Sequence, residues 1–290
     1  MTKILIIGAD GQLGCDLCKV IPQAEQIPLT IKEIDITDRN KTAKVIRSYA
    51  PDIVINTAAY HNVDECEDSL ERPFLVNTAG VKYLAEVCRE IEAALVQIST
   101  DYVFDGDKGA PYVETDIPSP QSIYAISKLG GEYCVKYMLA RYFIVRSTGL
   151  YGTAGCLGKG GGNFVENMLK RAASQAELKV VTDEVLSPTY TLDLAEKIYE
   201  LVKTKHYGLY HLVNRGQCSW HEFTCEIFRL LKRKVVINKA QAADFPTKAK
   251  RPKFSVLKNA NLAKIGLADM RPWQEALKAY LVEKGHLKSS

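Results

Sequence analysis

Four short runs rich in isoleucine and valine recur along the first half of this 290-residue chain, and they restrict its fold more than any other feature. Each run is bounded by Gly, Asn, Ser or Thr, and stretches with helical spacing separate the runs. Such continuous apolar runs are typical of strands buried on both faces of a parallel sheet. They span residues 3–8, 52–59, 94–100 and 142–148.

The segments between these runs predict helices over 38–50, 73–90 and 121–140, and the dipeptides "TD" and "RP" supply starts for the first two. The class is therefore α/β. After about residue 150 the pattern loosens into a glycine-rich segment, which favours a second, smaller lobe laid over one end of the sheet.

Composition excludes several classes of protein. The chain has 47% hydrophobic and 25% charged residues, as in soluble globular proteins, and it has no apolar run long enough to span a bilayer. The N-terminal "MTKILIIGADGQLG" is predicted to be a first strand rather than a signal peptide. The net charge of +4 is spread along the chain, so neither a nucleic acid nor a membrane is an expected partner.

Eight cysteines without an export signal predict reduced thiols and a cytoplasmic location. Cys15 and Cys18 form a Cys-x-x-Cys pair, but no second pair completes a zinc site, so no metal is predicted. A basic segment at 248–253, "KAKRPK", is more simply a solvated loop than an anion site.

Gly8, Gly11 and Gly14 follow the first predicted strand directly and lead into a helical stretch. Glycines at this spacing let the backbone approach a pyrophosphate, while the N-terminus of the helix meets its negative charge. We therefore expect a Rossmann-type doubly wound sheet with an NAD(P)-binding domain at 1–150. The substrate-binding lobe is expected mainly at 151–290, with a segment near 187–213 returning to the first domain.

The end of the second strand indicates the cofactor. Enzymes that prefer NAD place an acidic residue there for the ribose hydroxyls, whereas this chain has Thr30 and Lys32. The lysine would attract a 2′-phosphate, so NADPH is predicted and NADH stays possible.

The pattern Tyr-x-x-x-Lys occurs three times, at 124–128, 199–203 and 280–284. Only the first copy follows a predicted strand whose carboxyl end carries a hydroxyl, Thr100. Ligands of parallel sheets bind at these strand ends, and residues four apart share one face of a helix. The first copy is therefore predicted to be chemical, and the other two to be packing residues.

The predicted chemistry is reduction of a ketone. When hydride reaches the carbonyl carbon, charge develops on oxygen, and an acid must protonate it. Tyr124 is the predicted acid, and the Lys128 ammonium would lower its pKa and bind the nicotinamide ribose. Thr100 would donate a second hydrogen bond to the carbonyl oxygen.

These residues resemble those of the extended short-chain dehydrogenase/reductases, and more narrowly of the dTDP-4-dehydrorhamnose reductases. The resemblance covers nearly the whole chain. It is carried by the sequences "GADGQLG", "DITD", "NTAAYHNVDECE", "VNTAG", "STDYVFDG", "YAISKLGGE", "SPT" and "RPKFSVL".

The resemblance implies reduction of the 4-keto group of a dTDP-6-deoxyhexulose to give dTDP-L-rhamnose, with NADPH or NADH. It implies catalytic roles for Thr100, Tyr124 and Lys128 and a sugar contact at Asp101. The implied cofactor positions are Gly8, Gly11, Gln12, Leu13, Gly14, Asp35, Ile36, Ala58, Ala59 and His61, together with Tyr124 and Lys128.

One position departs from the family. Where the family has an aromatic residue against the deoxysugar, this chain has Gly149, and we expect Tyr151 or a glycine lid at 155–162 to fill the space. This departure leaves two alternatives open: a reductase or epimerase of another nucleotide sugar, and a non-catalytic dinucleotide-binding subunit. Whether the protein is a monomer or a homodimer is also left open.

Overall fold

A computed structural model describes residues 2–155 and 161–288. In these residues the main sheet has six parallel strands in the order β10-β5-β4-β3-β1-β2, which confirms the predicted doubly wound fold. All four predicted runs are strands of this sheet. Its strands are β1 (Ile4–Ile7), β2 (Gln26–Leu29), β3 (Ile53–Asn56), β4 (Ala94–Thr100), β5 (Tyr142–Ser147) and β10 (Gly208–His211).

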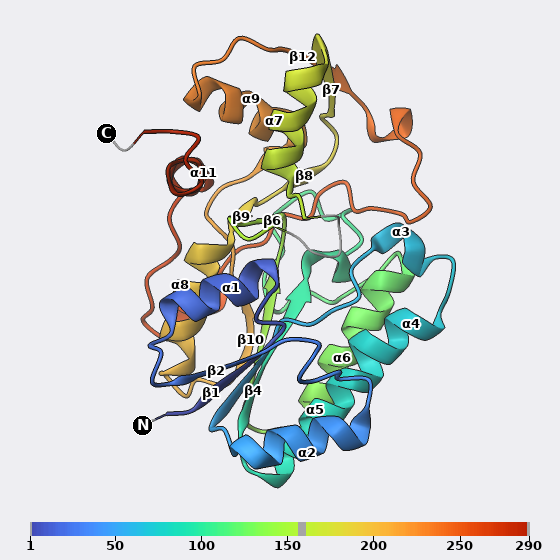
Figure 1. The fold of residues 1–290 in the computed structure, drawn as a ribbon. Helices are drawn as coiled ribbons and strands as arrows, with labels where there is room; N and C mark the ends of the chain where they lie inside the picture. The colour runs from blue at the N-terminus through green and yellow to red at the C-terminus, as the bar shows by residue number, and fades with distance from the viewer. Residues whose placement is uncertain (1, 156–160, 289–290) are drawn as a thin grey trace.

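Helices cover both faces of the sheet (Figure 1). Two helices pack on one face, where Leu17 and Ile198 join the core, and three pack on the other, around Leu84 and Val135. The first pair is α1 (Gln12–Val20) and α8 (Thr191–Val202), and the second group is α2 (Arg39–Tyr49), α5 (Val81–Glu90) and α6 (Ile123–Met138).

One of the two predicted helix starts is correct. The Asp38 side chain caps α2 by accepting a hydrogen bond from the Lys41 backbone N–H. The second start is two residues early, at Glu71, so Arg72 and Pro73 lie in the first turn of α4 (Glu71–Phe74), which continues through the π-helical η1 (Leu75–Gly80) into α5. Pro73 fits there because the first turn of a helix needs no N–H donor at that position.

A smaller group of elements lies above the carboxyl ends of the strands (Figure 1). Its aromatic core includes Phe223, Trp273 and Tyr280.

The other elements of the chain, in this group and elsewhere, are α3 (Val63–Cys66), η2 (Asp101–Val103), β6 (Leu150–Tyr151), α7 (Phe164–Ser174), β7 (Glu177–Val181), β8 (Val185–Leu186), β9 (Thr189–Tyr190), β11 (Cys218–Ser219), α9 (Trp220–Leu230), β12 (Val236–Ala240), η4 (Ala242–Asp244), α10 (Ala260–Lys264) and α11 (Trp273–Glu283).

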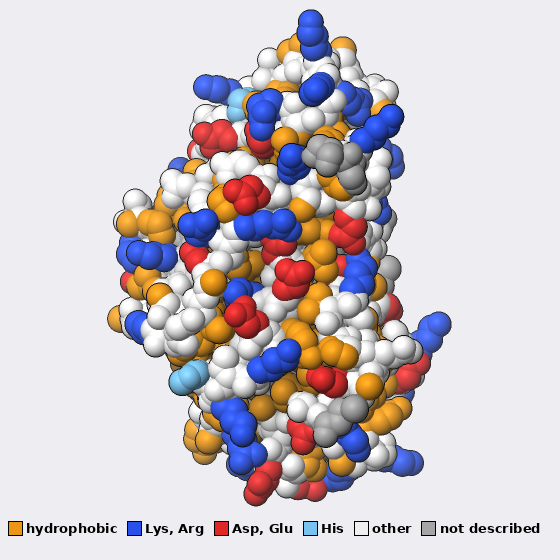
Figure 2. Space-filling model, turned by 90° about the vertical axis from the view of Figure 1, so that its left-hand side faces the viewer, with side chains coloured by type: hydrophobic (Ala, Val, Ile, Leu, Met, Phe, Trp, Pro, Cys, Tyr) orange, Lys and Arg blue, Asp and Glu red, His pale blue; other side chains and the backbone are white. Residues whose placement is uncertain are grey.

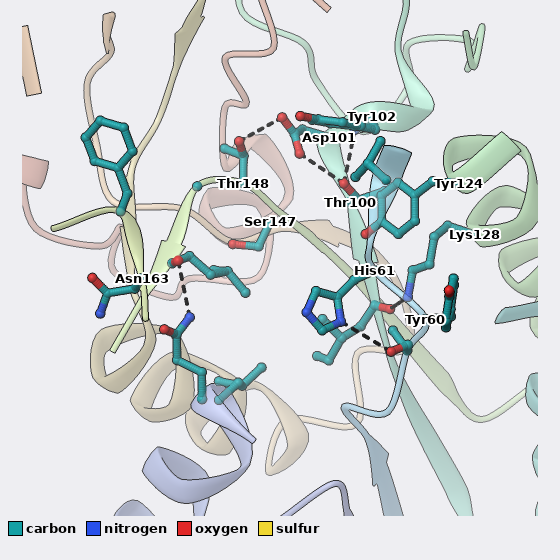
Figure 3. Close-up of a pocket in the computed structure, with 18 of the residues that line it drawn as sticks. Tyr60, His61, Thr100, Asp101, Tyr102, Tyr124, Lys128, Ser147, Thr148 and Asn163 are labelled. Carbon is teal, nitrogen blue, oxygen red and sulfur yellow. Dashed lines mark hydrogen bonds between the residues drawn. The ribbon is translucent and has the colours of Figure 1, made fainter. Parts of the chain in front are cut away.

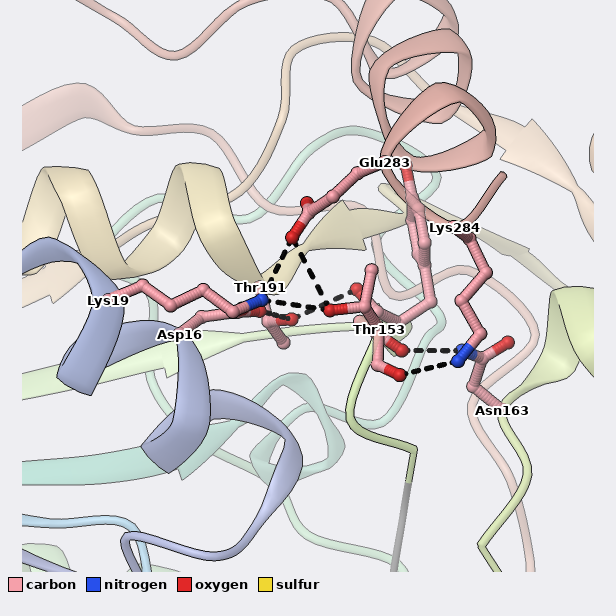
Figure 4. Close-up of polar contacts among 9 residues, drawn as sticks. Asp16, Lys19, Thr153, Asn163, Thr191, Glu283 and Lys284 are labelled. Atoms are coloured by element: carbon pink, nitrogen blue, oxygen red, sulfur yellow. Dashed lines mark hydrogen bonds and ion pairs between the residues drawn. The ribbon is translucent and has the colours of Figure 1, made fainter. Parts of the chain in front are cut away.

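A polar cluster ties α1 to this upper group (Figure 4). The Lys19 ammonium donates to Asp16 (2.7 Å), Glu283 (2.8 Å) and Thr153 (2.9 Å). The Asp16 carboxylate is fully buried and also accepts from the Thr191 hydroxyl at 2.6 Å. One lysine therefore connects the first helix of the chain to its last helix and to the residues that follow β6.

Lys and Arg side chains alternate with Asp and Glu on the face shown in Figure 2 and form no continuous basic stripe there. The helices in the described part of the chain are all too short or too polar to span a membrane.

Candidate active site

A cavity of about 1070 Å³ lies at the carboxyl ends of β1, β3, β4 and β5. Residues of α7, β7 and the segment 242–255 line its other side. The volume exceeds the range of about 300–1,000 Å³ that is usual for one small ligand. It therefore has room for a dinucleotide and a second ligand.

The glycine loop forms the tight turn that a pyrophosphate needs. Gly8 has φ +78°, and a Cβ there would lie 2.6 Å from Thr57 Oγ1. A Cβ on Gly14 would lie 2.1 Å from the Gly8 carbonyl oxygen. The N-cap residue of α1 is Gly11, which has no side chain to accept a hydrogen bond from the helix. The N-terminal N–H groups of α1 are therefore left for an anion.

Gln12 and Leu13 begin α1 and line the cavity. Gln12 Nε2 donates to the Leu150 carbonyl at 3.2 Å, while its Oε1 is buried without a hydrogen-bond partner. A buried acceptor of this kind fits a ligand that brings a donor. The backbone N–H groups of the loop and of the first turn of α1 thus fit a dinucleotide phosphate, whereas the Gln12 oxygen would need a donor such as a ribose hydroxyl.

Asp35 and Ile36, the predicted adenine-side residues, also line the cavity. The Asp35 carboxylate accepts from the N–H and the hydroxyl of Thr37, at 3.0 and 2.7 Å, and so fixes the local turn. This turn holds the Asp35 backbone and the Ile36 side chain at the wall of the cavity.

Glu33 lies beside the predicted ribose position and was missed by the sequence analysis. It accepts hydrogen bonds from the N–H and the hydroxyl of Thr30, at 2.8 and 2.6 Å. These bonds lower the pKa of Glu33. Lys32 is exposed next to it. A carboxylate and an ammonium therefore stand together at the end of β2.

Ala58, Ala59 and His61 follow β3 and line the cavity as well. The Ala58 N–H donates to the Asn56 side chain at 3.1 Å, and His61 Nδ1 lies 3.3 Å from the Ala59 carbonyl (Figure 3).

The predicted catalytic residues meet in this cavity (Figure 3). Thr100 ends β4, and Tyr124 and Lys128 share one face of α6, whose start is capped by the Ser122 hydroxyl. The Lys128 ammonium donates to the Ile98 carbonyl at 2.6 Å. The structure thus places an acid, a cation and a hydroxyl together beside the glycine loop.

The electrostatics of Tyr124 differ from the sequence-based expectation. Burial raises its pKa, and a hydrogen bond with Thr100 only partly offsets this. The expected lowering by Lys128 was wrong for this structure, because the ammonium is directed at the Ile98 carbonyl. A raised pKa keeps the phenol protonated, which suits a proton donor. Burial lowers the pKa of Lys128 to about 8, against the opposing effect of the Glu132 carboxylate.

Asp101 receives a converging set of hydroxyl donors. Thr100 donates to Oδ1 at 3.0 Å, and Thr148 donates to Oδ2 at 2.7 Å. Ser255 supplies a further hydrogen bond. Burial raises the pKa of Asp101, and these hydrogen bonds oppose the rise.

Gly149 also lines the cavity, in a left-handed conformation with φ +57°. A Cβ there would lie 2.5 Å from Leu186 Cδ1, so Leu186 occupies the space of a side chain at this position. The expectation that Tyr151 fills this space was wrong. Tyr151 is fully buried in the core of the upper group, where its ring stacks on Tyr190. The predicted lid at 155–162 falls largely on residues 156–160, outside the described residues.

The far wall of the cavity was not predicted. Phe164 and Trp220 stack there with ring centroids 4.3 Å apart, and Arg171 and Lys179 bring positive charge. No local motif signalled these residues.

Arg251 also lines the cavity and pairs with Asp64 of α3 at 3.0 Å. Lys248 pairs with Asp68 at 2.7 Å. The interpretation of 248–253 as a solvated loop holds for Lys248, Lys250 and Lys253, which are exposed, but was wrong for Arg251, which lines the cavity.

The other two Tyr-x-x-x-Lys copies lie away from this cavity. The Tyr199 hydroxyl donates to Glu25 at 3.0 Å, and Lys203 lies over the Tyr199 ring. The Tyr280 hydroxyl donates to Glu166 at 2.6 Å inside the upper group. Both copies pack between elements.

Within residues 2–155 and 161–288 the cysteines are free, and burial raises the pKa of both Cys15 and Cys18. The same residues hold no group of three His, Cys, Asp or Glu side chains that is suited to a metal ion.

A Rossmann-type sheet whose glycine loop faces a threonine, a tyrosine and a lysine is the arrangement of an NAD(P)H-dependent short-chain dehydrogenase/reductase. Comparisons narrow this class. The model of the RmlD substrate binding domain family matches residues 1–285. The chain belongs to this family, as the sequence motifs predicted.

Individual relatives are similar over nearly their whole length. The spore coat polysaccharide biosynthesis protein SpsK of Bacillus subtilis is 41% identical, over 98% of both chains. A dTDP-4-dehydrorhamnose reductase of Aggregatibacter actinomycetemcomitans is 36% identical, over 96% of this chain and 98% of its own. The crystal structure of a dTDP-4-dehydrorhamnose reductase of Bacillus anthracis in complex with NADP is 37% identical, covers 98% and 100% of the two chains, and superposes with a TM-score of 0.92.

Proposed function

We propose that this chain is an NAD(P)H-dependent dTDP-4-dehydrorhamnose reductase. It reduces the 4-keto group of dTDP-4-dehydro-6-deoxy-L-mannose to dTDP-L-rhamnose, the last step of dTDP-rhamnose biosynthesis. The observation that carries this proposal is the convergence of Thr100, Tyr124 and Lys128 beside the glycine loop. The names of relatives that match nearly end to end support it.

NADPH, when bound, supplies the hydride. The Tyr124 phenol donates its proton to the carbonyl oxygen as charge develops there, so the ketone gains one hydride and one proton. Lys128, whose ammonium donates to the Ile98 carbonyl, would hold the nicotinamide ribose, and Thr100 would turn its hydroxyl from Asp101 toward the reacting oxygen. Tyr124 is partly buried, which raises its pKa, so the phenol keeps its proton until hydride arrives.

NADPH is the proposed cofactor, and NADH remains an alternative. The NADP complex of the Bacillus anthracis relative supports this choice, as does the exposed Lys32 at the end of β2. The proposed division is a cofactor half at 1–150, completed by 187–213, and a substrate half mainly at 151–290. The cytoplasm is the proposed compartment, and a dTDP-linked deoxysugar is the proposed partner.

One observation favours a second candidate, a reductase or epimerase of another nucleotide sugar. The wall at Gly149 is backbone and Leu186 rather than an aromatic ring, which changes the surface offered to the sugar. A non-catalytic subunit is disfavoured, because a pure binder needs no buried acid beside the cofactor site.

The test is NADPH oxidation, followed at 340 nm, with purified protein and dTDP-4-keto-6-deoxy-L-hexose made in situ. Formation of dTDP-L-rhamnose is the expected result. Turnover of a different 4-keto nucleotide sugar with none of this one would support the second candidate. Cofactor binding without any turnover across such a panel would support the subunit.

A further inference from the structure

Glu132 lies one helical turn beyond Lys128 and is completely buried. Its Oε1 accepts a hydrogen bond from the Ser99 hydroxyl at 2.6 Å and another from Arg146 Nε at 2.8 Å. Its Oε2 accepts a third from Arg146 Nη2 at 2.6 Å. Glu132 therefore connects α6 to two different strands.

Both strands end at the cavity. Ser99 immediately precedes Thr100 on β4, and Arg146 lies opposite Ser99 in the register of β5. The Arg146 guanidinium is itself held over the Phe104 ring, 5.1 Å from the ring centroid. The contacts of Glu132 thus fix α6 to the sheet one residue away from the catalytic threonine.

Stability alone does not explain this pair. A buried ion pair costs much of its attraction in lost hydration, and apolar side chains of similar volume often serve a fold equally well. Glu132 and Arg146 are both at most 1% exposed, so they carry that cost in full. Their position behind the catalytic face of α6 suggests what they contribute instead.

We propose that Glu132 is a positioning residue of the reductase reaction. Through Ser99 and Arg146 it fixes the rotation of α6 that turns Tyr124 and Lys128 toward Thr100. Its carboxylate, four residues after Lys128 on the same face of the helix, also opposes loss of the Lys128 proton. The inference rests on the function proposed above, because it concerns the same catalytic residues.

The charge effect can be assigned to Glu132. Of the charged and titratable groups on Lys128's own helix and on the elements packed around it, Glu132 is the one that opposes the loss of its proton. Those groups include Tyr124, Asp101, Tyr102 and His61, which line the same cavity, and Arg146, which pairs with Glu132.

The test is the pH dependence of NADPH affinity, measured by nucleotide fluorescence in the full-length protein. A hydrogen bond from a charged donor is worth about 1 kcal/mol more than one from a neutral donor, or about fivefold in affinity. In Glu132→Gln, Lys128 should lose its proton at lower pH. NADPH affinity at pH 8 should then fall about threefold relative to wild type, because half of the wild-type lysine is itself neutral there, while staying within about twofold at pH 6. In the pH profile of kcat, the decline on the alkaline side should likewise begin at a lower pH than in wild type.

Three variants separate charge from shape. Glu132→Asp keeps the charge, so the alkaline limb of its kcat profile should lie at the wild-type pH. Ser99→Ala keeps both charges and should lower kcat without moving the limb. Glu90→Gln, which removes a surface partner of Arg47, should change neither kcat nor the pH of the alkaline limb. An equal loss at every pH in Glu132→Gln, or no loss at all, would overturn the proposal.

Glu132→Gln leaves Arg146 buried without its anion, which can prevent folding. If it does, Glu132→Gln/Arg146→Gln takes its place with a smaller shift in the same direction, because loss of the Arg146 cation offsets part of the effect of losing the carboxylate. NADPH binding needs no sugar substrate, so it tests this inference even if wild-type protein fails to reduce the dTDP-sugar. That failure would count against the proposed function alone.

Discussion

The hydroxyl of Thr100 donates to the carboxylate of Asp101, 3.0 Å away, and also lies within hydrogen-bonding reach of the Tyr124 phenol. The same oxygen accepts from the Tyr102 N–H at 3.2 Å. Since a hydroxyl has one proton, Thr100 can polarise a substrate carbonyl only after this bond rearranges. Asp101 therefore controls the direction in which Thr100 donates.

Asp101→Asn should lower kcat by about tenfold to a hundredfold, because an amide no longer accepts from both hydroxyls and one buried group loses its partner. Thr148→Val, which removes the other donor, should cause a smaller loss in the same parameter. Steady-state kinetics with saturating NADPH measure both. Full activity in Asp101→Asn would contradict the role given to this carboxylate.

Tyr124→Phe should bind NADPH nearly as wild type does but lower turnover by about 10²- to 10⁴-fold, as expected for a lost general acid. Tyr199→Phe is the matched control, since its hydroxyl donates to Glu25 and Tyr199 is not among the residues that line the cavity. Single-turnover hydride transfer followed at 340 nm separates the two. A comparable loss in Tyr199→Phe would show that the wrong Tyr-x-x-x-Lys copy was assigned.

Lys32→Glu should weaken NADPH binding about threefold to tenfold and leave NADH binding almost unchanged, because only NADPH carries the 2′-phosphate. Glu33→Gln, which removes the neighbouring carboxylate, should shift the preference in the opposite direction. Dissociation constants for both nucleotides at two salt concentrations measure the effect. An equal change for both nucleotides would place the 2′-phosphate elsewhere.

The protein should lose stability as the pH falls from about 6.5 toward 3 because of His211. Burial, assisted by the Arg146 guanidinium, lowers the pKa of this histidine to about 3 from a usual 6.5. The folded state therefore keeps His211 neutral, while the unfolded chain gains a proton below 6.5, so the free energy of unfolding decreases with falling pH.

Thermal melting between pH 4 and 7 checks this prediction. His211→Phe, which cannot titrate, should show a shallower pH dependence of Tm than wild type, whatever its absolute stability. The exposed His206 provides the control, and His206→Phe should keep the wild-type slope. Identical slopes in all three proteins would remove His211 as the cause.

Lys19→Met should destabilise the protein by about 1 to 3 kcal/mol, because it leaves the buried Asp16 carboxylate with Thr191 and without its cation. Lys170→Met, on the exposed side of α7, should cost little. Denaturant unfolding measures the two free energies. Equal effects would mean that the contacts of Lys19 contribute nothing beyond those of an ordinary surface lysine.

The sheet and the centre of the site were predictable because their signals are local. The run 94–100 is apolar enough to be a buried strand, and it ends in Thr100. The five residues from Tyr124 to Lys128 span one helical turn, so their shared face follows from helix geometry. The family was predictable because its motifs extend along nearly the whole chain.

The far wall of the cavity was not predictable, because it depends on contacts between distant segments. Asp64 and Arg251 form an ion pair across 187 residues of sequence, and nothing near either residue specifies the other. The direction of the Lys128 ammonium was missed for a related reason. The Ile98 carbonyl that accepts from it is a backbone group, which a side-chain pattern does not reveal.

Gly149 and Leu186 have a consequence for redesign of this enzyme. A cavity wall built from a left-handed glycine against a leucine cannot be altered by one substitution at residue 149, because any side chain would meet Leu186 and also strain the backbone. Libraries that aim to change substrate range should therefore trim Leu186 first. Residue 149 becomes a useful position only after that space has been opened.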